Sequence, residues 1–361
     1  ASTEWIARQY DHEVQGGSVL KPLLGVGRDV PADAAVLRPL LSSRRGLAYA
    51  QAILPFYSRI DAYAMTACTI DEAFRRVLAV GGDPDHVGGV DNFCWPSVQY
   101  DPVLNPDGRF KAAQLVRACR ALKETCLAYG IPLLSGKDSM YVDGHLPGSY
   151  GETHKVSALE TIQFSTISLV EDVRRCVSPE IKVAGDLLFA AGLTRDELGG
   201  SEYYRHLGYT GLKVPQVRGA DFLPLYRAIA ALVREEQLAS LHGVYRGGLA
   251  VHLALIAVAG GLGLRVDARR VPAEGVRRLD TLLFSESAGR FLFTADPARR
   301  RDIEARLQGF PVCCIGEVVS DPRLEILGLD GRVALAANLE ELAAAWKRPF
   351  GHLAQGGVGE R

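Results

Sequence analysis

Residues 131–144 read IPLLSGKDSMYVDG, in which a glycine, a lysine and an aspartate follow directly after a short apolar run. A phosphate-binding loop of the Walker type would read G-x-x-x-x-G-K-[ST]. Here the position five residues before Gly136 is Ile131, and Lys137 is followed by Asp138 instead of a hydroxyl residue. The stretch therefore fails the Walker pattern at two required positions. We interpret it as a loop at the end of a buried strand, where α/β layers commonly place their binding groups.

The segments on both sides of this stretch alternate between strand and helix patterns. Residues 64–82 and 111–130 carry apolar side chains at helical spacing, and both segments run into glycine, which commonly ends helices. Cys119 and Cys126 are spaced seven apart in the second of these helices, so we expect both thiols to fill the core. Strands are expected at 31–40, 47–54, 87–95, 131–135 and 160–173.

The same alternation begins again near residue 176. We expect strands at 182–192, 238–245 and 262–268, helices at 220–238 and 249–260, and a helix or turn followed by a strand at 280–296. The pattern leaves the order of the strands open. It predicts a linker at 1–27, a first domain at 28–176, a second domain at 177–350 and a flexible tail at 351–361.

The composition excludes several classes of protein. Hydrophobic residues make up 48% of the 361 residues and charged residues 23%, which is typical of a globular protein. The net charge is −1, which argues against nucleic acid or a membrane as the main partner. No apolar run approaches the length of a membrane-spanning helix. Seven cysteines without a C-x-x-C pair favour reduced thiols, so we expect a cytoplasmic protein.

Five motifs together resemble one family, phosphoribosylformylglycinamidine synthase, the ligase of the fourth step of purine synthesis. The resemblance runs from about Glu4 to Phe350, and the order and spacing of DNFCWPS and GKDSM make it specific. The five motifs are QYDHEVQ at 9–15, DNFCWPS at 91–97, GKDSM at 136–140, GGLAV at 247–251 and FSESAGRF at 284–291.

This resemblance implies a fold and an architecture. The expected fold class is α+β: one A-domain plus B-domain repeat of the aminoimidazole ribonucleotide synthetase-like superfold, with mixed sheets covered by helices. In the family, two homologous halves lie in one long chain, and this sequence corresponds to the second half with the linker that precedes it. The motif at 9–15 matches the end of the first half of the longer enzymes.

The resemblance also implies chemistry and partners. In the family, ATP with magnesium phosphorylates the amide oxygen of formylglycinamide ribonucleotide, and ammonia released from glutamine displaces the phosphate. The first half carries the catalytic site, so we assign no catalytic residue to this chain. The implied partners are the N-terminal synthetase half, a glutaminase domain or subunit, ATP and the ribonucleotide substrate. Because the family pairs its A domains, we expect that the isolated chain can form a homodimer through the same face.

Four positions correspond to the magnesium ligands of family members with an occupied second site. Asp33 and Glu72 match two of them, whereas Arg76 replaces an asparagine and Gly243 replaces an aspartate. Tyr245 stands where the family has a serine that contacts nucleotide. Arginine cannot bind a cation, so we expect a vestigial site without tightly bound metal, in which Arg76 pairs with Glu72, with Asp33 or with both. A residual weak nucleotide site is the alternative.

The lysine stretch supplies the candidates for substrate contact. Lys137, Asp138 and Ser139 match the GKDS loop of the family, and Asp91 lies in the DNFCWPS motif. We expect Lys137, Asp138 and Ser139 to contact phosphate or substrate; the alternative is a surface turn with a local ion pair. For Asp91, a role in binding and a role in a turn are equally open.

Other polar residues have plainer interpretations. His242 and His252 flank a glycine turn, and we expect satisfied core or capping histidines. Glu286 either approaches the cleft or stabilises a turn. Two alternatives to the ligase half remain: a structural pseudo-repeat without catalysis, and a free-standing ATP-dependent synthetase of the same superfold. The second is disfavoured because a working site needs its metal ligands.

Overall fold

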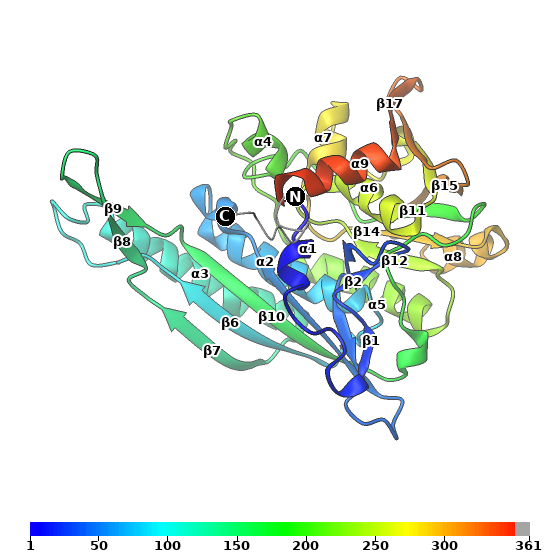
Figure 1. Ribbon diagram of the computed structural model, residues 1–361, viewed down its shortest axis with the longest axis horizontal. Coiled ribbons are helices and arrows are strands. Elements are labelled where there is room, and N and C mark those ends of the chain that lie inside the picture. The colour runs from blue at the N-terminus through cyan, green and yellow to red at the C-terminus, as the bar shows by residue number, and fades with distance from the viewer. Residues whose placement is uncertain (351–361) are drawn as a thin grey trace, which may run out of the picture.

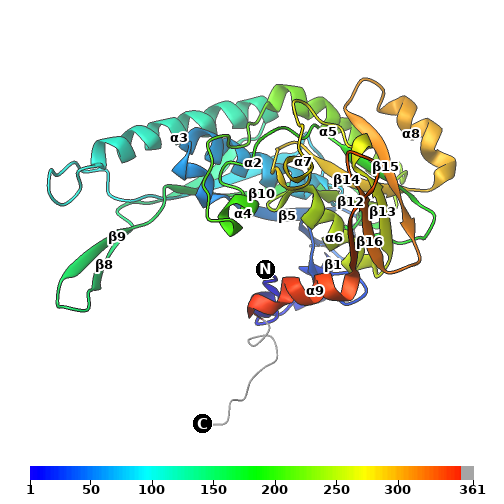
Figure 2. The same cartoon turned by 90° about the horizontal axis from the view of Figure 1, so that it is seen from above.

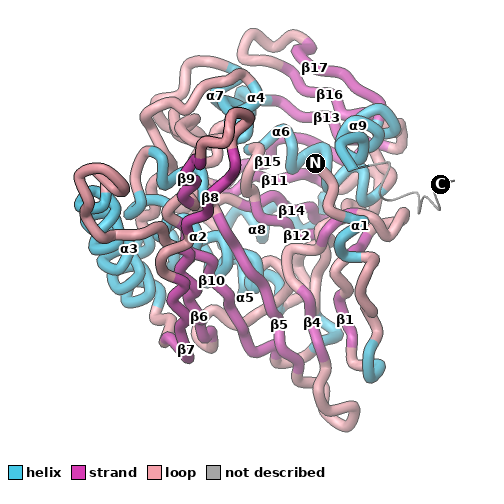
Figure 3. The backbone as a smooth tube through the Cα atoms, turned by 60° about the vertical axis from the view of Figure 1, so that its left-hand side comes forward, coloured by secondary structure: helices cyan, strands magenta, loops and turns pink. Residues whose placement is uncertain are grey.

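The structure, a computed structural model, describes residues 1–350, and the tail expected at 351–361 lies outside them. The chain forms two mixed sheets with helices packed against them (Figure 1), which confirms the predicted α+β class. The strands of the first sheet fall within residues 18–170 and those of the second within residues 187–338. The tube in Figure 3 shows the two groups of strands separately.

The first sheet has six strands in the order β1-β4-β5-β10-β6-β7, antiparallel except for the parallel pair β6–β7. Buried and less buried residues alternate along β5, β6 and β10, as expected for strands with one covered face. Two short pairs, β2–β3 and β8–β9, lie outside this sheet. The strands are β1 (Ser18–Leu20), β2 (Leu23–Leu24), β3 (Val30–Pro31), β4 (Ala35–Leu37), β5 (Gly46–Ile53), β6 (Val87–Cys94), β7 (Leu133–Ser139), β8 (Asp143–Pro147), β9 (Thr153–Ser157) and β10 (Thr161–Val170).

Helices α2 (Ala62–Leu78) and α3 (Gly108–Tyr129) lie side by side on one face of this sheet (Figure 2). The Asp61 side chain caps α2 by accepting hydrogen bonds from the backbone of residues 63 and 64. Almost every residue of α2 is buried, because the helix lies between the first sheet and elements of the second half of the chain. This central helix carries most of the charged residues of the candidate site.

The second sheet has seven strands in the order β12-β14-β11-β15-β13-β16-β17. Its alternating side chains divide between two cores: Phe189 and Phe293 face α5, α8 and α2, whereas Leu188 and Leu292 face α6, α7 and α9. The strands are β11 (Leu187–Ala191), β12 (Ser240–Gly243), β13 (Gly263–Asp267), β14 (Phe291–Ala295), β15 (Val312–Val319), β16 (Arg323–Leu327) and β17 (Val333–Asn338). The remaining helices are α1 (Glu4–Ala7), α4 (Glu202–His206), α5 (Gly219–Arg234), α6 (Gly248–Gly260), α7 (Leu279–Phe284), α8 (Arg300–Arg306) and α9 (Leu339–Lys347).

The lysine stretch differs from the prediction. Gly136, Lys137, Asp138 and Ser139 do not form a loop after a buried strand, because they are part of β7 itself. Backbone pairing continues along β6 as far as Ser139, which extends the strand through the whole motif. β7 is the edge strand of the sheet, and most of its side chains are exposed.

Three further expectations need correction or addition. The linker expected at 1–27 contributes β1, which pairs with β4 in the first sheet. Cys126 is buried as predicted, but Cys119 is exposed, because it lies on the outer side of α3. The projecting hairpin β8–β9 (Figures 1 and 2) was not predicted, since its sequence lacks the apolar alternation of a half-buried strand.

Within residues 1–350, no helix combines the length and the apolar character needed to cross a membrane.

Candidate functional site

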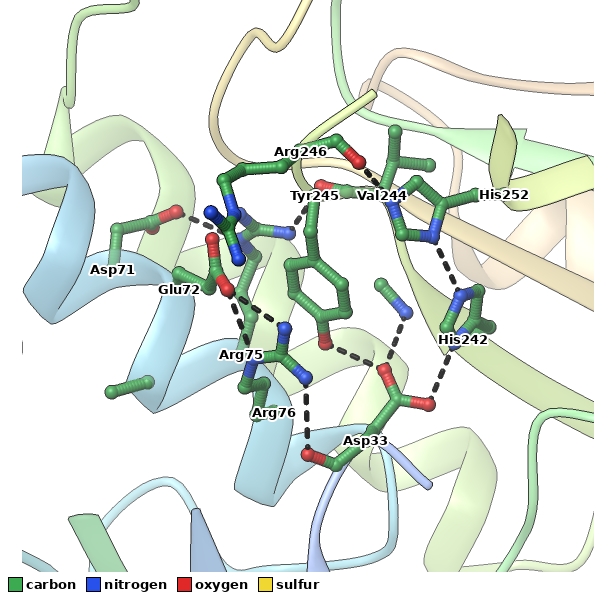
Figure 4. A network of polar contacts seen from close by, with 12 residues as sticks. Asp33, Asp71, Glu72, Arg75, Arg76, His242, Val244, Tyr245, Arg246 and His252 are labelled. Atoms are coloured by element: carbon green, nitrogen blue, oxygen red, sulfur yellow. Dashed lines mark hydrogen bonds and ion pairs between the residues drawn. The ribbon is translucent and has the colours of Figure 1, made fainter. Parts of the chain in front are cut away.

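The centre of the candidate site is Asp33, a buried carboxylate between β3 and β4 (Figure 4). Its Oδ1 accepts hydrogen bonds from the backbone N–H of Gly243 at 3.0 Å and from the Tyr245 hydroxyl at 2.6 Å. Its Oδ2 lies 2.7 Å from Nδ1 of His242. Burial alone would raise the pKa of Asp33, but His242, Tyr245 and Gly243 outweigh it and hold the pKa below its usual value. Asp33 is therefore an ionised carboxylate whose acceptor positions are occupied by protein donors.

A second histidine continues this network. His242 Nε2 lies 2.8 Å from His252 Nδ1, and His252 Nε2 lies 3.1 Å from the carbonyl oxygen of Arg246. Burial and the neighbouring His242 lower the pKa of His252 far below its usual value, so His252 is neutral. A carbonyl only accepts, so His252 donates through Nε2 and accepts through Nδ1. Nε2 of His242 faces this acceptor and Nδ1 of His242 faces Oδ2 of Asp33, so the two histidines link the Asp33 carboxylate to the backbone of Arg246.

Arg76 fills the side of the site that faces α2. Its Nη2 lies 2.8 Å from Oε1 of Glu72, so the predicted ion pair with Glu72 is present. Toward Asp33, Arg76 reaches only the backbone carbonyl oxygen, at 3.5 Å, and not the carboxylate. The guanidinium carbon lies 4.1 Å from the centroid of the Tyr245 ring, a cation–π contact. Of these two side chains, His242 and not Arg76 contacts the Asp33 carboxylate.

A second ion pair on α2 was not anticipated. Arg75 Nε lies 2.7 Å from Oδ2 of Asp71, and both side chains are almost fully buried. The hydroxyls of Tyr129 and Tyr226 donate to Asp71 Oδ1 at 2.6 and 2.5 Å. Arg75 also donates to the carbonyl oxygens of Val244 and of residue 290, so it ties α2 to the second sheet. The sequence DEAFRR at 71–76 contains both i,i+4 acid–arginine pairs, and this spacing was the available signal.

These contacts decide whether the residues fit a magnesium ion. Magnesium needs several free hard oxygens in near-octahedral geometry. Both carboxylate oxygens of Asp33 already accept from protein donors, and Glu72 binds Arg76. A Cβ added at Gly243 would lie 2.2 Å from the Tyr245 ring, so an aspartate there would displace the tyrosine from its position on Asp33. The donor set therefore does not fit magnesium, and residues 1–350 contain no group of three or more His, Cys, Asp or Glu placed to hold a metal ion.

The other candidate residues lie outside this network. Lys137 donates to the Ser139 hydroxyl at 2.5 Å on the exposed edge strand, and neither residue bonds to the Asp33 network. Asp91 on β6 is buried; burial and the nearby Asp138 raise its pKa. The structure thus brings Asp91 close to the GKDS segment and keeps both apart from Asp33.

Glu286 has a structural role. Its carboxylate accepts hydrogen bonds from the Tyr57 hydroxyl at 2.6 Å and from the backbone N–H groups of Gly247 and Glu202 at 2.7 and 2.9 Å. It therefore joins three separate segments of the chain: the turn after β5, the start of α4 and the glycine turn before α6.

Comparison with known proteins places this geometry in context. Residues 183–328, which contain most of the second sheet, match the family model described as AIR synthase related protein, C-terminal domain. Phosphoribosylformylglycinamidine synthase subunit PurL of Alkaliphilus metalliredigens is 31% identical over 350 residues, covering 96% of this chain and 43% of the relative. The PurL subunit of Methanopyrus kandleri is 32% identical over 359 residues, covering 98% of this chain and 45% of the relative. The chain thus spans less than half the length of these curated relatives.

Solved structures show the same fold at lower identity. The Thermotoga maritima PurL structure described as complexed with FGAR has a TM-score of 0.66 at 17% identity, covering 89% of this chain and 49% of that one. A ThiL structure, described as complexed with AMPPCP and TMP, has a TM-score of 0.54 at 15% identity. The fold is therefore that of aminoimidazole ribonucleotide synthetase-like proteins, as the motifs predicted. Over nearly its whole length, the chain is thus a sequence homologue of about half of phosphoribosylformylglycinamidine synthase subunit PurL.

Proposed function

We propose that this chain is the C-terminal half of an ATP-dependent carbon–nitrogen ligase. The complete enzyme would convert formylglycinamide ribonucleotide, ATP and ammonia from glutamine to formylglycinamidine ribonucleotide in purine synthesis. The observation that carries this proposal is the asymmetry of coverage: PurL relatives match 96% of this chain, whereas the chain matches 43% of their length. The unmatched part would be the N-terminal synthetase half, and a glutaminase would supply the ammonia.

The first sheet offers a surface for that missing half. α2 and α3 cover one face, whereas on the other face Tyr49 and Ile53 of β5 are 42% and 43% exposed. At the edge of the same sheet, β7 exposes most of its side chains as well. A half-apolar sheet face without a cover favours a protein partner. We assign this face to the N-terminal half; a homodimer of the isolated chain is the competing occupant.

The network around Asp33 supports a non-catalytic role for this half. The carboxylates that would bind magnesium already contact His242, Tyr245 and Arg76. Without such an ion, this site lacks the charge that phosphoryl transfer requires. The same observation favours a second candidate function, a structural pseudo-repeat that only supports its partner. It disfavours a free-standing synthetase that works through this site.

The direct test is an activity assay. The isolated chain, supplied with formylglycinamide ribonucleotide, ATP, magnesium and ammonium, should release no phosphate above background. Addition of a separately produced N-terminal half of a PurL relative is the second arm, and formation of an active complex would support the ligase half over the pseudo-repeat. Steady turnover by the purified chain alone would sink the proposal.

A further inference from the structure

A hollow of about 260 Å³ lies between the turn after β5 and the segment around α4, and Asp33, His242 and Tyr245 do not line it. The turn contributes Phe56 and Arg59, α4 contributes Arg205, and the loops on either side of α4 contribute Thr210 and glycine backbone. No acidic residue lines the hollow. Pockets for whole small molecules measure about 300–1,000 Å³, so this one suits the charged end of a ligand.

One aromatic ring orients both arginines of the hollow. The guanidinium carbon of Arg205 lies 3.4 Å from the centroid of the Phe56 ring, and that of Arg59 lies 5.4 Å from the same centroid. A guanidinium stacked on a ring keeps its N–H groups directed sideways, where they can bind an anion. Holding the side chains in place beforehand lowers the entropy lost on binding.

The two arginines differ in their ionic partners. Arg205 pairs with Glu202, whose carboxylate lies 3.1 Å from Nη1 of Arg205. The same carboxylate lies 3.5 Å from Nη1 of Arg246, so the two arginines share it. Arg59 makes no ion pair within the described residues 1–350. The hollow therefore carries a net positive charge. The exposed guanidinium of Arg59 has no carboxylate beside it, and that of Arg205 shares its carboxylate with a second arginine.

The loop that closes the hollow is held by its own backbone. Gly199 N–H donates to the carbonyl oxygen of Lys213 at 2.7 Å, and Gly200 N–H to that of Thr210 at 2.8 Å. Gly200 has a φ of +71°, and a Cβ there would lie 2.8 Å from the Tyr57 ring. Only glycine lets the loop approach the turn after β5 this closely. The wall of the hollow is thus built by local structure and does not depend on a ligand.

We propose that this hollow is a binding site for a phosphate monoester, with Arg59 and Arg205 as the anion-binding residues and Thr210 in the same wall. The planar fork of arginine matches phosphate oxygens in pairs, and the charge of a phosphate would compensate both guanidinium groups. The phosphate could come from a sugar phosphate or from a nucleotide, and these sources share the same chemistry. The site does not depend on turnover, so its test stands apart from that of the proposed function.

The test is calorimetric titration of the purified chain with inorganic phosphate at low ionic strength. Arg59→Ala and Arg205→Ala should each weaken binding about tenfold or more, and Arg59→Lys should weaken it less because the charge remains. Glu202→Gln should strengthen binding, since it frees Arg205. Arg45→Ala, an exposed arginine in the turn before β5, is the matched control and should bind as the parent does.

Parallel titrations identify the source of the phosphate. Tighter binding of ribose 5-phosphate than of AMP would assign the site to a sugar phosphate, and the reverse order to a nucleotide; ribose alone should not bind. Circular dichroism and thermal unfolding of each variant establish that the fold is intact. The proposal is overturned if the parent chain binds no phosphate in the millimolar range, or if both arginine variants bind it as the parent does.

Discussion

At the scale of single residues, Gly243 and Tyr245 act as a pair. The tyrosine hydroxyl takes one acceptor position of Asp33, and its ring occupies the space that a side chain at position 243 would need. Burial and the charge of Asp33 raise the pKa of Tyr245 well above its usual value, so the hydroxyl stays protonated and donates. The groups around Asp33 therefore fill both its acceptor position and the space beside position 243.

Tyr245→Phe tests the strength of this contact. The change leaves a buried carboxylate oxygen with one donor fewer, which should lower the free energy of unfolding by about 1–3 kcal/mol. Urea unfolding followed by fluorescence measures the difference. Tyr150→Phe, at a side chain that is 96% exposed, is the matched control and should change stability little. Equal stabilities of the two variants would show that the hydroxyl does not support Asp33.

Restoring the family's ligands tests the interpretation of the site as vestigial. The unaltered chain should show no magnesium-dependent binding of ATP at Asp33 and Glu72, because Tyr245 and Arg76 occupy these two carboxylates. The triple variant R76N/G243D/Y245S supplies two further oxygen ligands and removes the obstructing ring, so it should gain such binding. G243D alone should not, since its Cβ would meet the tyrosine. A crystal of the unaltered chain with metal-bridged triphosphate at these carboxylates would contradict this prediction.

At the scale of elements, α2 carries two i,i+4 ion pairs, and Arg75 of one of them also bonds to carbonyl oxygens beside the second sheet. The Asp71–Arg75 pair is buried and is completed by two tyrosine hydroxyls. Asp71→Ala would leave a buried guanidinium without its carboxylate, which should cost about 3–5 kcal/mol. Glu304→Ala breaks the exposed i,i+4 pair with Arg300 and should cost about 0.5 kcal/mol or less. Chemical denaturation of both variants makes the comparison, and similar losses would refute the structural role of Asp71.

The edge strand β7 carries a prediction of its own. Lys137 is exposed and bonds only to Ser139 within the described residues, so Lys137→Ala should leave the stability of the isolated chain unchanged within about 0.5 kcal/mol. In the complete enzyme, a lost charge-assisted contact with phosphate should lower kcat/KM roughly 10- to 150-fold. Thermal unfolding and steady-state kinetics measure the two effects. Unchanged kinetics would leave Lys137 as a surface residue of an edge strand.

The sequence predicted the elements with strong apolar periodicity and missed those without it. Helices α2, α3, α5 and α6 lie where their spacing placed them, because each buries an apolar face. The hairpin β8–β9 and the continuation of β7 through the GKDS segment are exposed, so no hydrophobic pattern marks them. The Arg76–Glu72 pair was predictable from i,i+4 spacing. The Asp33–His242 pair was not, because it joins residues 209 positions apart.

At the scale of the whole molecule, the Asp33 network joins the two halves of the fold. Asp33 precedes β4 of the first sheet, whereas His242 lies in β12 of the second and His252 in α6. Changes in this network should therefore alter the stability of the entire molecule, and protonation is one such change.

The pH dependence of unfolding tests this connection. In the folded protein, the pKa of His252 is far below its usual value. On acidification, His252 therefore takes up a proton in the unfolded chain before it does so in the folded protein, and the free energy of unfolding falls once the pH drops below about 6.5. One such proton contributes about 1.4 kcal/mol per pH unit. The pKa of Asp33 is also lowered, so its contribution is present above about pH 4 and is lost as the pH falls through the folded value. Urea unfolding between pH 7.5 and 5 should show this decline, and His252→Asn should reduce its slope by about one proton. An unchanged slope in that variant would mean that the decline does not arise from a neutral His252 in the folded protein.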